Sequence, residues 1–382
     1  MRNKFIILLA SVALLIAPAV FAQDAPPMPE ITGDIVATGL NSPQGLLLDS
    51  DGRLWIADSG LGGDEEIEFY NIHTLQPQVA NFGMTSRIIR LNDAGEQEVM
   101  ASLPSVAVGE DLIGLARLAE VEGVVYATIG SWQSGLGETP AIPHQGELIR
   151  LEDGEAVTVA DLWAHEFAND PDESTNVESH PYGITVGPDG MMYVADAAAN
   201  AVWRVDLETG TVETVVAFPG LPGVFPGPFY DGELITDPVP TAVDFDAEGN
   251  MYVSLLSGAP FIPGSAKIVQ VSEEGEISDF ATGMTMLTDM QMGPDGNLYA
   301  TSFGMFTEEG PVFNSGYVVR ILSDGTTEIV IDGLPFVTAL AFDTQGNGYV
   351  AINGAPIPEA GMVVYYEGLT DMDGMPMPEI GG

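Results

Sequence analysis

The sequence contains no cysteine and few basic residues. Of its 382 residues, 10 are lysine or arginine and 56 are aspartate or glutamate, which gives a formal net charge of −46 at pH 7. The lack of cysteine excludes disulfides, thiolate metal sites and thiol chemistry. Because so negative a surface repels polyanions, we expect no nucleic-acid partner, and we expect cations to be attracted.

Histidine is scarce as well, and complete catalytic motifs are missing. The chain has 4 histidines. No His-Glu-x-x-His pair, nucleophile elbow or glycine-rich phosphate loop occurs in the sequence. The sequence therefore offers no complete catalytic constellation, and it leaves open whether the protein is an enzyme.

Long apolar runs are missing except near the N-terminus. Arg2 and Lys4 precede an apolar run over residues 5–16, and small residues end it at Ala22. This pattern predicts a cleavable signal peptide over residues 1–22, a linker over residues 23–32, and a secreted or periplasmic protein. A membrane anchor is the alternative, but the run is short for a span and no stop-transfer charges follow it. We expect no membrane insertion after cleavage.

What the sequence does have is a repeat that covers most of the chain. The segment "HPYGITVGPDGMMYVAD" has counterparts such as "SPQGLLLDSDGRLWIAD" and "LTDMQMGPDGNLYATS". When the copies are aligned on a turn glycine, each has an aromatic residue three positions later. The glycines are Gly52, Gly123, Gly190, Gly249, Gly296 and Gly346, and the aromatics are Trp55, Tyr126, Tyr193, Tyr252, Tyr299 and Tyr349. Such regular self-similarity indicates a repeat architecture.

Each copy predicts four β-strands. Two apolar-alternating segments around the turn glycine form a hairpin, and segments such as "AVWRV" and "ETVVAF" supply a third and a fourth strand. The sixth copy lacks its fourth strand, but "GDIVATGL" near the N-terminus resembles one. We therefore predict an all-β fold: a six-bladed β-propeller over residues 33–368, with four-stranded blades, whose last blade is closed by the N-terminal strand at about residues 34–40. Residues 369–382 would form a C-terminal tail. An open β-solenoid is the alternative, and it does not predict the missing strand at the other end of the chain.

Nearly all insertions fall on one face of the predicted propeller. If the strands of a blade are numbered outward from the axis, the loops from the second to the third strand and from the fourth strand to the next blade share this face. The long ones span residues 59–86, 131–146, 161–180, 219–240, 256–266 and 303–316. Long loops on a rigid scaffold often carry binding residues. Their aromatics, among them Trp132 and Phe261, are candidates to line a ligand groove, and packing of the loops onto the propeller is the alternative.

Further ligand-binding candidates stand where the innermost strands begin, at the mouth of the central channel. They are Gln44, Tyr182, Thr241 and Thr338, with His180 just outside the strand. Pro181 favours an extended approach of His180 to the strand. A histidine at such a place can serve as an acid–base group or a metal ligand. These assignments rest on position alone.

One inner-strand residue is unusual. Seven residues before the turn glycine, most copies have glycine or alanine, whereas the fifth has Asp289. A carboxylate at a crowded hub is costly unless it meets a cation or several hydrogen-bond donors. We therefore consider one divalent cation, with calcium as the first choice, held by Asp289, Asp244 and Asn353. A carboxylate satisfied by structural hydrogen bonds is the alternative. The arginines shared by the third strands are interpreted as ties between blades: they are Arg90, Arg150, Arg204 and Arg320.

The repeat also resembles known families. "PYGITVGPDGMMYVADAAANAVWRVD" resembles the NHL and SMP-30-like propeller repeat, and "VPTAVDFDAEGNMYVSLLSGAPFIPGSAKIVQV" with "LTDMQMGPDGNLYATSFG" resembles the secreted ScyD/ScyE-type propellers, first named from scytonemin pigment clusters. The resemblance covers residues 33–368 and implies an exported six-bladed propeller. Pigment-cluster members are associated with late extracytoplasmic steps on an indolic–phenolic precursor. SMP-30-type lactonases hold one divalent cation at the channel mouth. Only Asp289 and Asn353 match such ligands here, and no glutamate stands at an inner-strand start.

Together these features favour an exported, monomeric β-propeller that binds a small molecule, for which an aromatic one is a candidate, or a protein partner on its long-loop face. The alternative is a metal-assisted enzyme, a lactonase-like hydrolase or a pigment-precursor coupling enzyme, with a divalent cation in the central channel as Lewis acid. Several protein oxygens converging on one point of the channel would favour the enzyme.

Overall fold

The computed structural model of the chain describes residues 31–71, 76–109, 111–131, 141–172, 177–227, 230–307 and 310–378. The predicted signal peptide, nearly all of the predicted linker and Trp132 lie outside these ranges. Within the described ranges, none of the helices combines the length and the hydrophobicity that a membrane span requires.

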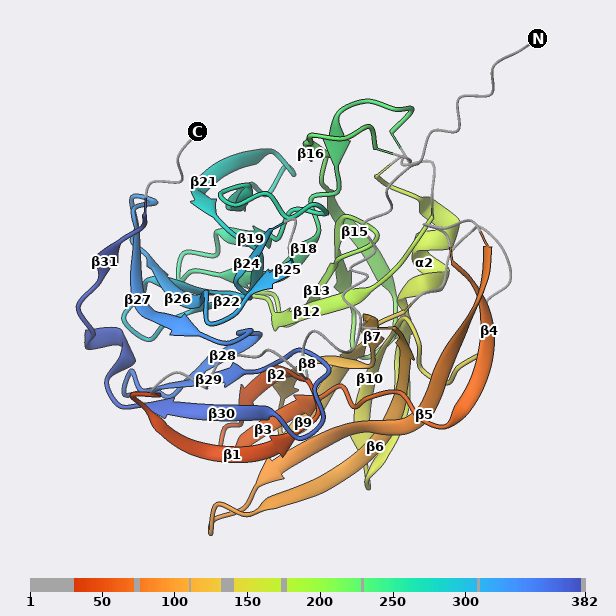
Figure 1. Cartoon of the computed structure of the whole chain (residues 1–382), viewed down its shortest axis with the longest axis horizontal. Coiled ribbons are helices and arrows are strands. Elements are labelled where there is room, and N and C mark those ends of the chain that lie inside the picture. The colour runs from red at the N-terminus through yellow and green to blue at the C-terminus, as the bar shows by residue number, and fades with distance from the viewer. Residues whose placement is uncertain are drawn as a thin grey trace.

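Six β-sheets of four or more strands surround a common axis (Figure 1). Their innermost strands are β2 (Pro43–Leu48), β8 (Leu115–Val121), β12 (Pro181–Val186), β18 (Pro240–Phe245), β22 (Leu287–Met292) and β28 (Ala339–Phe342). Each of these strands contacts the next in this order, and β28 contacts β2, so the ring is closed. The fold is therefore an all-β propeller, as the repeat predicted.

The other strands complete the blades in chain order. Blade one adds β3 (Leu54–Asp58), β5 (Gln76–Leu91) and β6 (Gln97–Val108), blade two adds β9 (Val124–Ile129), β10 (Glu147–Glu152) and β11 (Glu155–Asp161), and blade three adds β13 (Met192–Asp196), β14 (Ala201–Val205) and β15 (Val212–Ala217). Blade four adds β19 (Met251–Leu255), β20 (Ala266–Val271) and β21 (Ile277–Met284), blade five adds β23 (Leu298–Ser302), β26 (Gly316–Ile321) and β27 (Thr327–Leu334), and blade six adds β29 (Gly348–Ile352) and β30 (Gly361–Tyr366).

The N-terminal strand closes the last blade. Strand β1 (Asp34–Leu40) pairs antiparallel with β30, with Asp34 opposite Tyr365 and Leu40 opposite Gly361. Leu40 is fully buried and belongs to a core cluster that also contains Ile89 of blade one. The first and last strands of the ring thus share one sheet, which leaves no free edge on β30.

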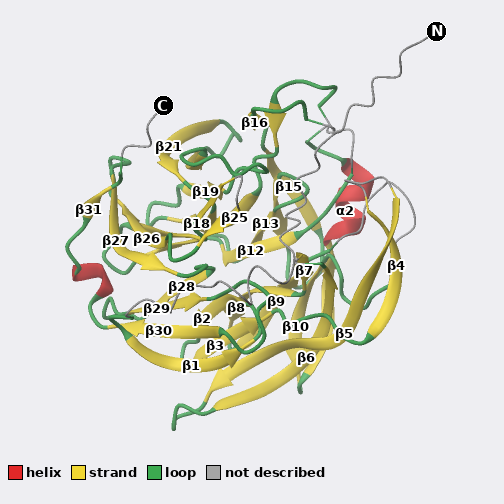
Figure 2. Cartoon of the chain, viewed as in Figure 1, coloured by secondary structure: helices red, strands yellow, loops and turns green. Residues whose placement is uncertain are grey.

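The long connections contain most of the additional elements. They are β4 (Glu65–Asn71), α2 (Leu162–Asn169), β16 (Leu221–Pro222), β17 (Ile235–Thr236), β24 (Met305–Thr307) and β25 (Gly310–Val312), and Figure 2 shows α2 at the periphery. Strand β7 (Asp111–Ile113) leads from blade one to blade two. Beyond residue 368, where a tail was expected, the 3-10 helix η1 (Leu369–Asp371) and β31 (Met375–Pro376) follow, and β31 pairs with β27 of blade five.

The repeated aromatic residues have a structural role. In four blades the aromatic side chain donates a hydrogen bond to an aspartate of the tight turn: Trp55 to Asp49, Tyr193 to Asp189, Tyr252 to Asp246 and Tyr299 to Asp295. The turn glycines have positive φ, as Gly190 does at 79°, which explains why glycine recurs there.

Arg90, Arg150 and Arg204 bind acidic partners within their own blades, which corrects the interpretation as ties between blades for these three. Arg320 also donates to the carbonyls of Thr370 and Met372, beyond blade six, so it does join blade five to another part of the ring. Arg90, Arg204 and Arg320 stand directly opposite Glu98, Glu213 and Glu328 on the neighbouring outer strand, and each donates a hydrogen bond to that partner at 2.7 to 2.8 Å. Cross-strand register therefore decides their partners.

Candidate functional site

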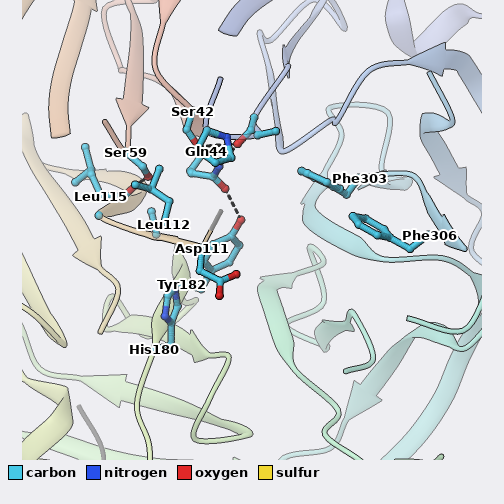
Figure 3. A pocket seen from close by; sticks show the side chains of 15 residues that line it. Ser42, Gln44, Ser59, Asp111, Leu112, Leu115, His180, Tyr182, Phe303 and Phe306 are labelled. Carbon is cyan, nitrogen blue, oxygen red and sulfur yellow. Dashed lines mark hydrogen bonds between the residues drawn. The ribbon is translucent and has the colours of Figure 1, made fainter. Parts of the chain in front are cut away.

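A cavity of about 200 Å³ lies at the mouth of the central channel (Figure 3). Residues at the starts of innermost strands and in the long connections line it. Its polar side chains are Ser42, Gln44, Ser59, Asp111, His180 and Tyr182, and its apolar side chains include Leu112, Leu115, Phe303 and Phe306. Three ligand-binding candidates from the sequence, Gln44, His180 and Tyr182, are thus brought together.

A hydrogen-bonded pair forms the centre of the polar wall. The Tyr182 hydroxyl donates to Gln44 Oε1 at 2.9 Å, and Gln44 Nε2 donates to the Gly354 carbonyl at 2.9 Å and to Ser42 Oγ at 3.0 Å. These contacts join blade three to blade one and to the connection between β29 and β30 of blade six. Because every polar atom of the Gln44 amide has a partner, its orientation is fixed before any ligand arrives.

His180 stands at the edge of the same wall. Its Nδ1 lies 3.2 Å from the Ser131 carbonyl, and its ring packs on Gly130, where a Cβ would lie 2.6 Å from the imidazole. Burial lowers the pKa of His180, although the Asp196 carboxylate opposes this shift, so the imidazole is neutral at pH 7. The Asp111 carboxylate, from β7, lies in the same part of the cavity (Figure 3).

The opposite wall is aromatic. Phe303 and Phe306 face the Gln44–Tyr182 pair across the cavity in Figure 3, and their rings stack at 6.2 Å between centroids. Phe261 packs against Phe306 at 5.7 Å and does not line the cavity. This corrects its assignment as a lining residue, because the ring contacts a lining residue and not the cavity itself.

Arg117 of β8 closes the channel below the mouth. Its guanidinium lies 4.4 Å from the centroid of the Tyr182 ring, and its Nη2 donates to the carbonyls of Thr288 and Thr338. Its Nε lies 3.4 Å from Asp289 Oδ1, and both side chains are about 5% exposed. One side chain of blade two thus contacts blades three, five and six across the axis.

The residues proposed for a channel metal do not fit one. Asp289 accepts backbone N–H groups of Met290 and Leu340, both at 3.0 Å, and its remaining charge faces Arg117. Burial raises the pKa of Asp289, and Arg117 and these two N–H groups oppose that rise. Asn353 precedes Gly354 of the mouth cavity, lines neither cavity, and its amide donates to the Ala360 carbonyl at 3.1 Å. The cation that Asp289 meets is therefore an arginine.

Asp244 lies with Asp289 on a second cavity, of about 230 Å³, on the other side of Arg117. Its carboxylate accepts the N–H of Met292 at 2.7 Å and of Phe245 at 2.8 Å. Burial raises the pKa of Asp244 to about 6 in spite of these donors, and the nearby Asp289 adds to the rise. This pair of carboxylates does not reach the mouth cavity.

Two further candidates, Thr241 and Thr338, form hydrogen bonds between neighbouring blades. Thr241 Oγ1 donates to the Leu287 carbonyl at 2.9 Å, and Thr338 Oγ1 donates to the Pro43 carbonyl at 2.6 Å. Both side chains are buried, and neither lines the mouth cavity. Their assignment to ligand binding is corrected for this reason: a hydroxyl at the start of an inner strand points at the next blade.

Sequence reasoning missed Arg117, because counting back from the turn glycine put Ala116 at this position. The turn of blade two is one residue shorter than that of blade one: two residues separate Val121 from its partner Val124, whereas three separate Asp49 from Arg53, to whose carbonyl the Asp49 N–H donates. This shift moves Arg117 into the position that Gly45 occupies in blade one. Arg117 also stands apart from the arginines of the third strands, and that was the available signal.

The fold and the mouth cavity together define a β-propeller with a pocket of small-molecule size on its axis. No protein-family model matches the chain, and no curated protein matches it. Similar solved structures include the PQQ-bound form of an aldose sugar dehydrogenase from Streptomyces coelicolor, with 13% identity, a TM-score of 0.53, and coverage of 89% of this chain and 99% of that one. A gluconolactonase from Xanthomonas campestris has 12% identity, a TM-score of 0.52, and coverage of 87% and 88%.

A putative gluconolactonase is similar over 95% of this chain and 99% of its own, with 13% identity and a TM-score of 0.50. At such identities the similarity shows the propeller fold alone. The narrower resemblance to ScyD/ScyE-type propellers is not among these findings, and it remains a prediction.

Proposed function

We propose that the protein binds a small molecule with one ring in the mouth cavity. The observation that carries the proposal is that a pre-oriented polar wall and an aromatic wall face each other across one cavity. Ligand sites in proteins are commonly apolar pockets with a few fixed polar groups. The ScyD/ScyE-like hypothesis, which implies an indolic or phenolic ligand, agrees with this chemistry.

The size and charge of the cavity restrict the ligand. The volume of about 200 Å³ lies below the usual range for drug-sized ligands, roughly 300 to 1,000 Å³, so one ring or the end of a longer molecule fits. Arg117 is buried beneath Tyr182 with its charge directed at Asp289, whereas the Asp111 carboxylate lines the cavity. We therefore expect neutral or cationic ligands in preference to anions.

The test uses indole, phenol and tyramine as neutral and cationic probes, and 4-hydroxybenzoate as the anionic probe. Binding is measured by saturation-transfer NMR with the full-length protein. We expect the first three probes to bind and the anion to bind at least about tenfold more weakly. Phe306→Ala should weaken binding by roughly 10- to 100-fold, because about 1.5 to 3 kcal/mol accompanies the burial of such a ring.

Phe225→Ala is the matched control, since Phe225 is 62% exposed and does not line the cavity. It should leave probe affinities unchanged. The proposal fails if none of the ring probes binds, if the anion binds as well as they do, or if Phe306→Ala and Phe225→Ala behave alike.

The proposal includes export, which rests on the apolar run that precedes Ala22. It treats the protein as a monomeric binding protein for a small molecule, and a protein partner on the same face is the other prediction from the sequence. The metal-assisted enzyme receives less support, because Asp289 is paired with Arg117 and Asn353 does not line the cavity that Asp289 and Asp244 share.

A further inference from the structure

A cluster of three carboxylates lies away from the mouth cavity, at the end of helix α2. The helix begins after Asp161, whose side chain accepts the N–H of Ala164 at 2.8 Å. It ends at Asp170, which has a left-handed backbone with φ of 40°. Glu166, Asp170 and Asp172 each place one carboxylate oxygen within 4.8 Å of the others.

The interior member of this cluster has no partner among the described residues. Glu166 is 1% exposed, and neither of its carboxylate oxygens accepts a hydrogen bond from the described part of the chain. Oδ1 of Asp170 is buried and without a partner in the same sense. Buried polar atoms in native structures nearly always have partners, so an unpartnered carboxylate points to a group that binds it.

The surroundings make a bare anion at this place especially costly. Like charges at positions i and i+4 of a helix repel, and the carboxyl end of a helix disfavours negative charge. The carboxylates of Asp196, Asp172 and Asp170 all act electrostatically on Glu166, and no positive group opposes them in the last turn of the helix. A proton or a metal cation must therefore compensate the cluster.

The donor set selects the kind of cation. Three carboxylates are hard oxygen ligands, the type that Ca²⁺ and Mg²⁺ prefer over softer metals. Ligand oxygens of Ca²⁺ lie about 2.3 to 2.6 Å from the ion, so oxygens within 4.8 Å of one another can share one ion. We propose that Glu166, Asp170 and Asp172 form a Ca²⁺ site at the end of α2.

The neighbouring contacts suggest what the ion would stabilise. Asn200 donates to Asp172 Oδ2 at 2.8 Å and accepts the N–H of Val239 at 3.3 Å, so Asp172 is tied to the segment that enters blade four. On the same connection, His180 donates its backbone N–H to Asp196 at 2.6 Å. A cation at the cluster would fix α2 to the connection that leads to His180. The cluster shares no residue with the mouth cavity.

The experiment uses the full-length protein after treatment with EDTA and exchange into chelator-free buffer. Ca²⁺ is titrated by calorimetry in 0.5 M NaCl, which suppresses weak binding to the acidic surface. We expect one tight equivalent per chain and a rise of Tm with Ca²⁺ concentration, as a ligand that binds only the folded state requires. Mg²⁺ in place of Ca²⁺ tests whether the site distinguishes the two ions.

The variant Glu166→Gln distinguishes a cluster that binds a cation from one that is compensated by a shared proton. The variant removes a ligand charge and also relieves the burial of an anion. Its apo form should be at least as stable as the apo parent, while its affinity for Ca²⁺ should fall at least tenfold and its Tm should no longer respond. Glu65→Gln, an exposed carboxylate on β4, is the control and should bind Ca²⁺ like the parent. The proposal is overturned if the parent binds no stoichiometric Ca²⁺, or if Glu166→Gln binds it as the parent does.

Discussion

Replacement of Arg117 by methionine tests how the propeller is held together at its axis. Methionine keeps much of the length and the apolar stem of the arginine, and it removes the charge and every donor. The variant loses the ion pair with Asp289, the two hydrogen bonds to the carbonyls of Thr288 and Thr338, and the contact with the Tyr182 ring. Three other blades therefore lose a partner through one substitution.

The loss of stability expected for Arg117→Met follows from the burial of the ion pair. Removal of one partner of a buried ion pair typically costs about 3 to 5 kcal/mol, because the other charge is left uncompensated. Asp289 retains two backbone N–H donors, which limits the loss, and the two freed carbonyls add to it. We therefore expect the free energy of unfolding to fall by about 3 to 5 kcal/mol in total. With an unfolding entropy of about 2.1 cal/mol/K per residue over roughly 340 residues, Tm should fall by about 4 to 7 °C.

The assay is thermal unfolding of the parent, Arg117→Met, Asp289→Asn and the double variant. The single changes should not add: the double variant should be more stable than their sum predicts by about 1 to 3 kcal/mol. Arg150→Met is the matched control, since Arg150 pairs with Glu152 at the surface, where such a pair contributes less than about 1 kcal/mol. If Arg117→Met lowers Tm no more than Arg150→Met, or if the two channel substitutions add, the pair does not hold the ring together.

Two further predictions concern closure and pH. Deletion of residues 33–40 removes the buried Leu40 and exposes the edge of β30, so we expect Tm to fall by more than 10 °C and the protein to associate; an unchanged Tm would show that closure through β1 contributes nothing. Asp244 has a pKa of about 6 in the folded chain against about 3.9 when unfolded, so the folded state holds this proton longer. The parent therefore loses stability through this group as pH rises from about 4 to about 6. Asp244→Asn should gain Tm relative to the parent across this window and keep that gain at higher pH, and a difference that does not change with pH would contradict the assignment.

The blades could be predicted from the sequence because the features that form a blade act between residues close together in the chain. Turn glycines with positive φ and alternating apolar positions recur in each copy, aromatics bonded to turn aspartates recur in four, and each acts within about 20 residues. Closure by β1 was predictable for a related reason, since one copy lacked a strand and one spare strand was present. These features do not require knowledge of contacts between residues far apart in the sequence.

The channel was harder to predict because its contacts depend on register. A turn shorter by one residue brings Arg117 into the hub, where the repeat alignment placed Ala116. The same alignment identified Asp289 as unusual, but it could not show that a residue 172 positions earlier supplies the opposing charge. The cluster at Glu166 was missed for a different reason. In a chain with 56 acidic residues, three of them in one long connection give no signal until their burial is known.

The position of Arg117 also limits the chemistry that the channel can perform. The mouth cavity and the cavity of Asp244 lie on opposite sides of the Arg117–Asp289 pair, so a ligand against Phe303 and Phe306 cannot reach either channel carboxylate without displacing the arginine. Among the described lining residues, the titratable side chains at the mouth are Asp111, His180 and Tyr182. His180 is neutral at pH 7 because burial lowers its pKa, and its Nδ1 faces the Ser131 carbonyl, so only Nε2 is left to meet a ligand. One neutral imidazole beside one carboxylate suffices to bind and orient a ring with a polar group. Arg117, which contacts both the Tyr182 ring and Asp289, stands between these mouth residues and the channel carboxylates.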